Sequence, residues 1–360
     1  MSEKSARPSR AELPELLRKD DGSVIASTGQ WRLHVRKIGP AWIDLVYGPL
    51  PPKPVRTRAQ LLHRIESAPL GGAIQSHWRI LCAAAPQQAF MLSLLRPPGR
   101  SRYPVILSGD ACWRYTSDQA VHEILRRGYA LAQFNRVEIA PDPPGLRARP
   151  RGQRYGAIAV WAWAYMRCVD VLQNMDGIDA QAIAVTGHSR GGKAALLAGA
   201  LDARIALTHA NNSGTGGSGS FHAMGRGSET PAQLVGAFPH WMGPDLAAYA
   251  GREATLPMDQ HLVKAMIAPR ALLTTDAQGD LWANPSGCKR SFEAAREVYR
   301  LLGVEERCAI TMREGGHPMS MQDWIALLDF ADAQMIGSTS RRFAAGSGPG
   351  RSADTSLRAN

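Results

Sequence analysis

One block of the sequence, residues 183–201, constrains the fold more than any other. The apolar run IAVT is followed by the pentapeptide Gly-His-Ser-Arg-Gly at 187–191 and then by the helix-forming run KAALLAGAL. This order predicts a strand, a sharp turn and a helix, with Ser189 in strained backbone above a sheet and glycines on both sides that avoid Cβ clashes. The helix N-terminus behind the serine favours developing negative charge. We interpret the block as a nucleophile elbow; the alternative is a plain glycine-rich turn.

Strand-like and helix-like runs alternate along the chain from residue 87 onward. The strand candidates are mostly short apolar runs bounded by turn residues, which is typical of buried parallel strands. They lie at 88–97, 103–109, 129–135, 183–189, 205–211, 270–277 and 308–314. The predicted helices are 121–129, 157–175, 191–202, 291–303 and 321–335, of which 157–175 is expected to be long and amphipathic. This alternation predicts an α/β fold with a mainly parallel sheet and helices on both faces.

The two ends of the chain differ in composition from its middle. Residues 1–41 are polar and interrupted by proline, which predicts a loosely docked N-terminal arm. Residues 337–360 are mostly small, polar and rich in Gly and Ser, which predicts a disordered C-terminal tail. Residues 42–336 are then expected to form one decorated α/β domain.

Charge and composition exclude several classes of protein. The chain has 42 Lys and Arg against 31 Asp and Glu, a net charge of +11, but the basic residues are scattered, so we expect no nucleic-acid partner, while an acidic polysaccharide stays open. No stretch approaches the roughly 18 apolar residues of a membrane span, and the first residues lack the apolar core of a signal peptide, so we expect no membrane partner and a cytoplasmic location. The five cysteines are widely spaced and predict reduced thiols rather than disulfides or a metal site.

A serine nucleophile needs a base and an acid, which follow it in the order Ser, acid, His when the serine stands on such an elbow. His317 lies in the turn Glu-Gly-Gly-His-Pro between a predicted strand and the last helix, which is where the base is expected. The loop after strand 270–277 offers Asp276 and Asp280 as acids. Asp280 is preferred because it stands further into the loop, whereas Asp276 is close enough to the strand end to cap it. Solvated loop carboxylates remain the alternative, and His240 and His261 remain candidates for substrate contacts or structural roles.

Several blocks together resemble one known family. In chain order they are AIAVWAWAYMRCVDVL, VTGHSRGGKAALLAGALDARIALTHANNSGTGG, FPHW, LPMDQHLVKAMIAPRALL, GDLWANPSG and DWIALLDFAD. They closely resemble the glucuronoyl esterases of carbohydrate esterase family 15, and the resemblance covers roughly residues 42–336. It implies an α/β-hydrolase catalytic domain, a three-layer sandwich, that cleaves the ester between 4-O-methyl-glucuronic acid on xylan and lignin alcohols without metal or cofactor.

The resemblance also assigns roles to individual residues. Ser189 matches the nucleophile and His317 the base. Arg190 matches an arginine that helps to form the oxyanion hole, a role that suits a charge-assisted donor beside the nucleophile. Asn212 stands where fungal members carry a glutamate as the triad acid, and because asparagine cannot stabilise an imidazolium by charge, the acid is expected at Asp280, a site used by some bacterial relatives.

Three further residues are assigned to substrate binding. Lys193 resembles a family lysine that contacts sugar hydroxyls; the competing interpretation is a lysine that snorkels from the first helical turn. Trp282 matches a tryptophan beside the sugar, with a core tryptophan as the alternative, and Trp241 of the FPHW block is also expected to contact substrate.

The expected partner is therefore a small-molecule or oligosaccharide ester bound by a monomer. Two alternatives stay open. One is a promiscuous intracellular esterase acting on acetylated sugars or small-molecule esters. The other is a catalytically dead hydrolase-like binding module.

Overall fold

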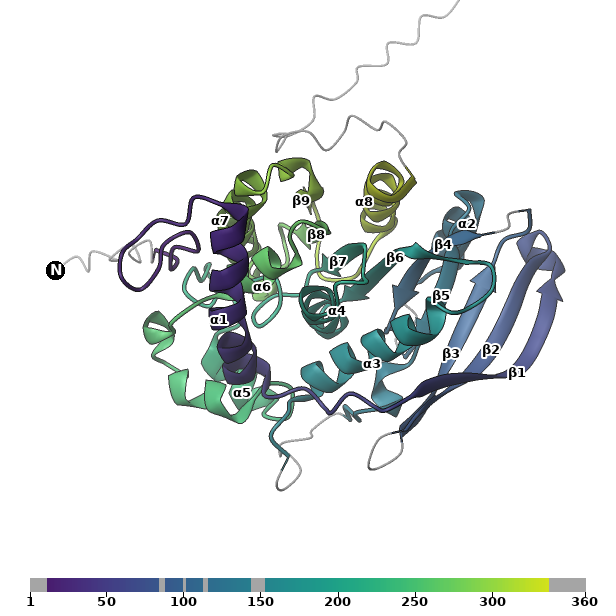
Figure 1. Ribbon diagram of the computed structural model, residues 1–360, viewed down its shortest axis with the longest axis horizontal. Helices are drawn as coiled ribbons and strands as arrows, with labels where there is room; N and C mark the ends of the chain where they lie inside the picture. The colour runs from purple at the N-terminus through teal and green to yellow at the C-terminus, as the bar shows by residue number, and fades with distance from the viewer. Residues whose placement is uncertain (1–11, 84–87, 100–101, 113–115, 144–152, 337–360) are drawn as a thin grey trace, which may run out of the picture.

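A nine-stranded sheet runs through the centre of the computed structural model, which describes residues 12–83, 88–99, 102–112, 116–143 and 153–336 (Figure 1). The strand order is β1-β2-β3-β5-β4-β6-β7-β8-β9. The pairs from β5 through β4 to β9 are parallel, whereas β1, β2, β3 and β5 pair antiparallel. The strands are β1 (Thr57–Ser67), β2 (Ala73–Cys82), β3 (Gln88–Arg96), β4 (Tyr103–Ser108), β5 (Ala130–Phe134), β6 (Ile178–His188), β7 (Leu207–Asn211), β8 (Ala271–Ala277) and β9 (Cys308–Arg313).

Helices cover both faces of the sheet, which makes three layers. One apolar cluster joins the sheet to α2 and α8, and a larger one joins its other face to α1, α3, α4, α6 and α7. The helices are α1 (Thr28–Tyr47), α2 (Asp118–Arg126), α3 (Ala157–Leu172), α4 (Arg190–Leu201), α5 (Pro231–Ala237), α6 (Gln260–Ile267), α7 (Pro285–Leu301) and α8 (Met321–Ala331). This is the predicted α/β-hydrolase sandwich, and it brings the carboxyl ends of the parallel strands to one edge, where ligands bind in folds of this kind.

The parallel half of the sheet matches the predicted strands closely, whereas β1, β2, α1, α5 and α6 were not predicted. Most of β1 is exposed on both faces and so shows no alternation of apolar and polar residues, and the burial pattern of β2 does not alternate regularly either. Helix α3 is not amphipathic: every residue except Asp170 is buried. It lies between α4 and the β1–β2 end of the sheet, so it has no solvent face.

The described part of the N-terminal segment is packed, so the prediction of a loosely docked arm is wrong there. Helix α1 runs across the predicted boundary at residue 41 without a break, although Pro40 lies inside it. Leu16, Ile25 and Trp31 belong to the larger apolar cluster. The Pro14 carbonyl accepts a hydrogen bond of 2.7 Å from His261 Nε2. A few well-spaced apolar residues hold this polar segment in place, and the predicted tail, 337–360, lies outside the described residues.

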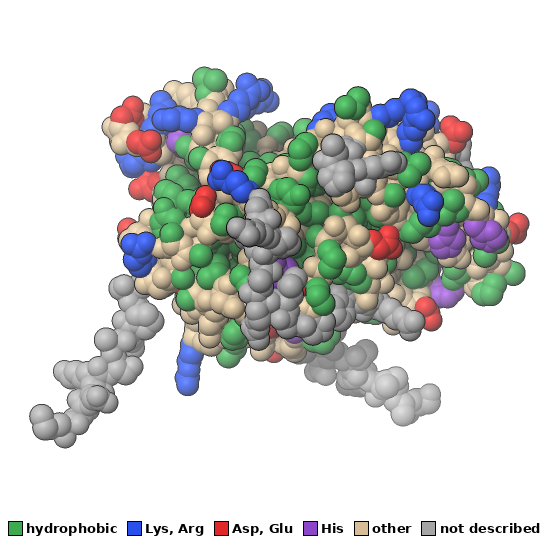
Figure 2. Space-filling model, turned by 90° about the horizontal axis from the view of Figure 1, so that it is seen from below, with side chains coloured by type: hydrophobic (Ala, Val, Ile, Leu, Met, Phe, Trp, Pro, Cys, Tyr) green, Lys and Arg blue, Asp and Glu red, His purple; other side chains and the backbone are tan. Residues whose placement is uncertain are grey.

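Neither the surface charges nor the cysteines point to a particular binding site. Figure 2 shows Lys and Arg side chains spread over one face of the molecule rather than gathered in a single patch. All five cysteines are unpaired. Within the described ranges, no helix is both long and apolar enough to cross a membrane, and no three His, Cys, Asp or Glu side chains gather as a metal site requires.

Acid should destabilise the fold through His209, which joins the three central strands. Its ring nitrogens lie 2.7 Å from Thr186 Oγ1 on β6 and 2.9 Å from Thr275 Oγ1 on β8. Burial lowers the pKa of His209 from 6.5 to about 4. Between pH 6.5 and about pH 4, His209 is therefore protonated in the unfolded chain and neutral in the folded protein. As the pH drops through this window, the free energy of unfolding falls by about 3 kcal/mol.

The measurement is the melting temperature of His209→Gln and of the unsubstituted protein between pH 7 and pH 4. We expect the variant to lose less stability across this window than the unsubstituted protein. Other buried groups titrate in the same range and make the comparison between variants necessary. Among them, His188, with a pKa of about 4, adds to the effect, and Asp276, with a pKa raised to about 6 by burial, opposes it. His122→Gln, on the surface of α2, is the matched control. An unchanged pH dependence in His209→Gln would contradict the prediction.

Candidate active site

Ser189 stands on a strained turn between β6 and α4. Its backbone has φ 54° and ψ −121°, a conformation that residues with a side chain rarely adopt. A Cβ on Gly187 would lie 2.3 Å from the Gly191 carbonyl oxygen, and a Cβ on Gly191 would lie 2.0 Å from an oxygen of Asp110. Both flanking positions therefore require glycine. The expected elbow geometry is present, with Ser189 immediately before the first residue of α4.

A buried ion pair lies beneath this turn. Asp110 follows β4, and its Oδ2 accepts the backbone N–H of His188 at 2.7 Å. Its other oxygen pairs with the fully buried Arg136, whose guanidinium lies 5.0 Å from the ring centroid of Trp161. Burial raises the pKa of Asp110, and the charge of Arg136 opposes that rise. The sequence prediction missed this support; the available signal was a carboxylate directly after a buried parallel strand.

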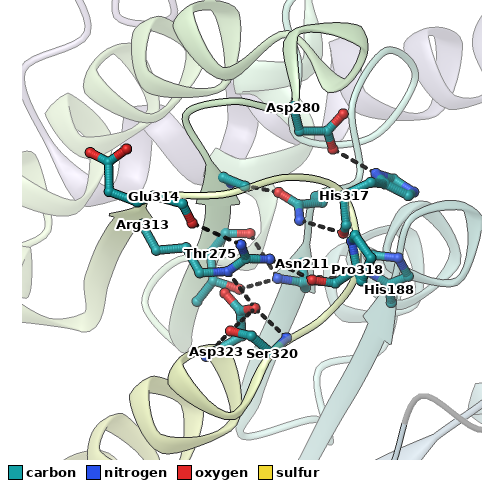
Figure 3. A network of polar contacts seen from close by, with 12 residues as sticks. His188, Asn211, Thr275, Asp280, Arg313, Glu314, His317, Pro318, Ser320 and Asp323 are labelled. Carbon is teal, nitrogen blue, oxygen red and sulfur yellow. Dashed lines mark hydrogen bonds and ion pairs between the residues drawn. The ribbon is translucent and has the colours of Figure 1, made fainter.

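His317 and Asp280 form a pair near His188, the residue before Ser189 (Figure 3). His317 Nδ1 lies 2.5 Å from Asp280 Oδ2, and the Asp280 side chain is 7% exposed while that of His317 is 43% exposed. The centroid of the His317 ring lies 4.6 Å from that of His188, the residue before Ser189. A carboxylate can only accept, so Nδ1 carries a proton and Nε2 is the nitrogen that can act as a base.

The histidine before the nucleophile is held neutral. His188 Nδ1 donates to Asn211 Oδ1 at 2.5 Å, and burial lowers the pKa of His188 to about 4. It therefore brings no positive charge to the face of the His317 ring at neutral pH.

Asp276, the other candidate for the acid, and Asn212, at the position of the fungal glutamate, have different surroundings. Asp276 is buried within β8, burial raises its pKa to about 6 against the charge of Lys264, and no bond joins it to His317 in the described structure. Asn212, with φ 40°, donates from Nδ2 to the His317 backbone carbonyl at 2.8 Å. Asn212 thus holds the main chain of the histidine loop, and the carboxylate bound to the ring is Asp280.

The histidine loop is also held from the side of α8. Arg313, at the end of β9, donates to the Pro318 carbonyl at 2.6 Å. Its Nε pairs with Asp323 of α8 at 2.7 Å, and Asp323 also caps that helix with Ser320 (Figure 3). The loop therefore has fixed anchors on both sides of His317.

Arg190 projects from the first position of α4 over an aromatic pair. Its guanidinium carbon lies 4.5 Å from the ring centroid of Trp241, and Trp241 stacks on Phe238 with centroids 3.8 Å apart. Arg190 Nη1 is bonded to Asp142 Oδ2 at 2.6 Å. Trp241 is buried, so in this structure it supports Arg190 from below; the prediction that it touches substrate is not tested by this arrangement.

Lys193 and Trp282, the two other residues predicted to bind substrate, lie close to the loops that follow β7 and β8. Lys193 is buried and donates to the carbonyls of Ser213 and Thr215 at 2.6 Å and 2.5 Å. Glu229 is buried too; burial raises its pKa and the charge of Lys193 opposes that rise. Trp282 is 51% exposed, and its backbone carbonyl accepts the Glu229 N–H at 3.0 Å. The sequence prediction missed Glu229, because a lone glutamate in a Gly- and Ser-rich loop looks like a solvated residue.

The two histidines left open by the sequence have different surroundings. His240 Nε2 lies 3.0 Å from Asp142 Oδ1, close to Arg190. His261 is buried in α6 and bonded to the Pro14 carbonyl, so it has a structural role in holding the N-terminal segment.

Comparison with known proteins decides the family. The family model described as "Glucuronyl esterase, fungi" matches residues 89–303, well over half of the chain. The chain belongs to the glucuronoyl esterase family. It is 33% identical over 256 residues to carbohydrate esterase MZ0003 from an unknown prokaryotic organism, which covers 64% of this chain and 58% of that protein. It is 30% identical over 303 residues to a 4-O-methyl-glucuronoyl methylesterase of Podospora anserina, covering 79% and 59%.

Solved structures of CE15 enzymes share the fold over most of this chain. A promiscuous CE15 esterase from a marine bacterial metagenome superimposes with a TM-score of 0.81 at 26% identity, over 90% of this chain and 97% of that one. The CE15 glucuronoyl esterase of Caldicellulosiruptor kristjansonii gives 0.78 at 27% identity, over 96% of both chains. The sequence matches to MZ0003 and to the Podospora anserina enzyme, in contrast, span less than two thirds of those proteins' own length.

Proposed function

We propose that this protein is a serine esterase that hydrolyses esters of glucuronic acid or 4-O-methyl-glucuronic acid through an acyl-enzyme. The observation that carries the proposal is the bond between His317 Nδ1 and buried Asp280, beside the strained turn of Ser189. Membership of the glucuronoyl esterase family supports the choice of the uronic acid ester as substrate.

In the proposed reaction, His317 Nε2 takes the proton of Ser189 Oγ as that oxygen attacks the ester carbonyl. Asp280 stabilises the imidazolium that forms, and His317 then gives the proton to the departing alcohol oxygen. An acyl-enzyme on Ser189 remains. His317 next takes a proton from water, whose oxygen attacks the acyl carbon, and returns it to Ser189 as the free uronic acid leaves.

The negative charge of each tetrahedral intermediate develops beside Arg190. A guanidinium donates charge-assisted hydrogen bonds, and the backbone N–H groups at the N-terminus of α4 add to the same field. This arrangement needs no metal, since every proton and charge in the scheme has a residue of this chain to accept it.

In this proposal Lys193, Glu229 and Trp282 bind the sugar. A buried lysine and a buried glutamate offer a donor and an acceptor for neighbouring hydroxyls of one sugar ring. An ammonium group has three N–H donors, of which the Ser213 and Thr215 carbonyls take two. The exposed face of Trp282 suits packing against the sugar, and Trp241 is assigned an indirect role beneath Arg190. A monomeric state and a cytoplasmic location remain predictions.

The substrate class is tested by comparing kcat/KM for benzyl glucuronate, benzyl galacturonate and p-nitrophenyl acetate. We expect benzyl glucuronate to be preferred over the acetate by about 10²-fold or more, although p-nitrophenol is the better leaving group, because the acetate makes none of the contacts that Lys193, Glu229 and Trp282 are proposed to make with the sugar. Ser189→Ala is the control for background hydrolysis of each ester. A preference for the acetate would instead favour a promiscuous esterase, the description given to the similar marine metagenome enzyme.

A further inference from the structure

Three donors converge on one buried carboxylate, that of Asp142. Its side chain is 3% exposed. Oδ2 accepts from Arg190 Nη1 at 2.6 Å, while Oδ1 accepts from Trp241 Nε1 at 2.8 Å and from His240 Nε2 at 3.0 Å. Burial opposes ionisation of Asp142, but the hydrogen bonds from Trp241, Arg190 and His240 outweigh it and lower its pKa. A full negative charge is therefore held at this point at neutral pH.

The placement of Asp142 ties distant parts of the chain to the elbow. Asp142 lies between two prolines in the segment after β5, where restricted φ angles limit the backbone. His240 and Trp241 come from the loop after α5, and Arg190 is the first residue of α4. The carboxylate thus joins two loops to the residue next to Ser189.

Arg190 is the member of this group that needs an anchor. An arginine side chain has many rotamers and loses entropy when it is held in one of them. The Arg190 side chain is 28% exposed, so without an anchor it could adopt several conformations. The Trp241 ring fixes the plane of the guanidinium from one face and Asp142 fixes one of its edges. A guanidinium has five N–H donors, more than one carboxylate oxygen uses, so the anchored group can still present a donor to an oxyanion.

We propose that Asp142 is a positioning residue that holds the Arg190 guanidinium at the oxyanion site through a direct ion pair and through the indole of Trp241. The inference rests on the proposed esterase function, in which Arg190 stabilises the tetrahedral intermediate. Asp142 itself touches no reacting atom. Its effect therefore belongs to kcat rather than to KM, because the oxyanion exists in the transition state and not in the bound ester.

The test is a double-mutant cycle of Asp142→Asn and Arg190→Ala, with kcat and KM measured for both benzyl glucuronate and p-nitrophenyl acetate. Arg190→Ala removes a charged oxyanion donor and should lower kcat by about 10²–10³-fold. Asp142→Asn keeps the shape of the side chain but places either an amide N–H or an uncharged, weaker acceptor against Arg190. We therefore expect kcat to fall by about 10–100-fold, with KM changed by no more than about twofold. In the Arg190→Ala background, Asp142→Asn should have almost no further effect, since the residue that it positions is gone.

The matched control is Asp202→Asn at the opposite end of α4. Asp202 is also a buried aspartate paired with an arginine, Arg204, at 2.6 Å. Its loss should change the melting temperature and leave kcat unchanged. Concentrations of folded enzyme are taken from the end point of fluorophosphonate labelling, so that a loss of folded protein is not counted as a loss of kcat. If Asp142→Asn does not fold, Asp142→Glu serves in its place, because it keeps the charge but displaces it by one methylene.

Two results would overturn the inference: an unchanged kcat in both Asp142 variants, or an equal loss in the presence and absence of Arg190. The second substrate separates this failure from a failure of the proposed function. If the acetate is the better substrate but its kcat falls in Asp142→Asn and not in the Arg190→Ala background, the positioning role stands and the assignment of the uronic acid ester is wrong.

Discussion

Replacing Ser189 with alanine should lower kcat for ester hydrolysis by about 10⁴–10⁶-fold, with KM little changed. In the proposed mechanism the serine oxygen is the atom that forms the acyl-enzyme, and no residue of α4 carries a hydroxyl that could replace it. His317→Ala should cost a similar factor, because without a base the serine stays protonated and a poor nucleophile. Ser189 and His317 are both partly exposed rather than part of the core, so the melting temperature should move by only a few degrees. The measurement is steady-state kinetics together with fluorophosphonate labelling, which should modify the unsubstituted protein and not Ser189→Ala.

Ser67→Ala is the matched control for this experiment. Ser67 ends β1, at the opposite edge of the sheet from β9, and its loss should change neither kcat nor labelling. The unsubstituted protein tests the alternative that the chain is not an active enzyme. If it hydrolyses no ester and takes up no fluorophosphonate label, the chain is a binding module that has kept the residues of an esterase without their activity.

The parallel core could be predicted from the sequence because burial on both faces leaves a simple pattern. Strands β4, β7 and β8 are buried along their whole length and appear in the sequence as short apolar runs between turn residues. The exposed antiparallel strand β1 has no such pattern and was missed. Helix α1 was missed for a related reason, since Pro40 and many polar residues hide the few apolar side chains that dock it.

The residues of the candidate site also divide into those that the sequence reveals and those that it does not. Ser189 is recognisable because its strained turn imposes glycines at fixed positions in the adjacent sequence. Asp142 and Glu229 contact residues far away in the chain, and nothing beside them in sequence distinguishes them from loop residues. Asp110 and Asn212 follow buried strands, but the residues that they contact depend on how β4, β5, β7 and the loops after them come together, so local patterns could not have assigned their roles.

Asp280→Asn should lower kcat by about 10³–10⁴-fold without a large change in KM. The carboxylate lies 2.5 Å from His317 Nδ1 and is almost fully buried, so its charge acts on the imidazolium with little screening by water. An asparagine removes that charge. Its amide N–H can also bond to Nδ1 and leave the proton on Nε2, the tautomer that cannot accept from Ser189. Labelling of Ser189 by the fluorophosphonate should slow in parallel with kcat, because both reactions need the same base.

Asp276→Asn is the matched control, since Asp276 is only four residues away and is also buried. Asp276 makes no bond to His317 in the described structure, and its charge is opposed by burial and favoured by Lys264. Its amide variant should therefore change the free energy of unfolding and its dependence on pH, and leave kcat within a few-fold. The reverse result, a severe loss in Asp276→Asn and a mild one in Asp280→Asn, would show that the acid of the triad is Asp276. Equal and severe losses in both variants, with normal melting temperatures, would mean that the two carboxylates act on His317 as a coupled pair.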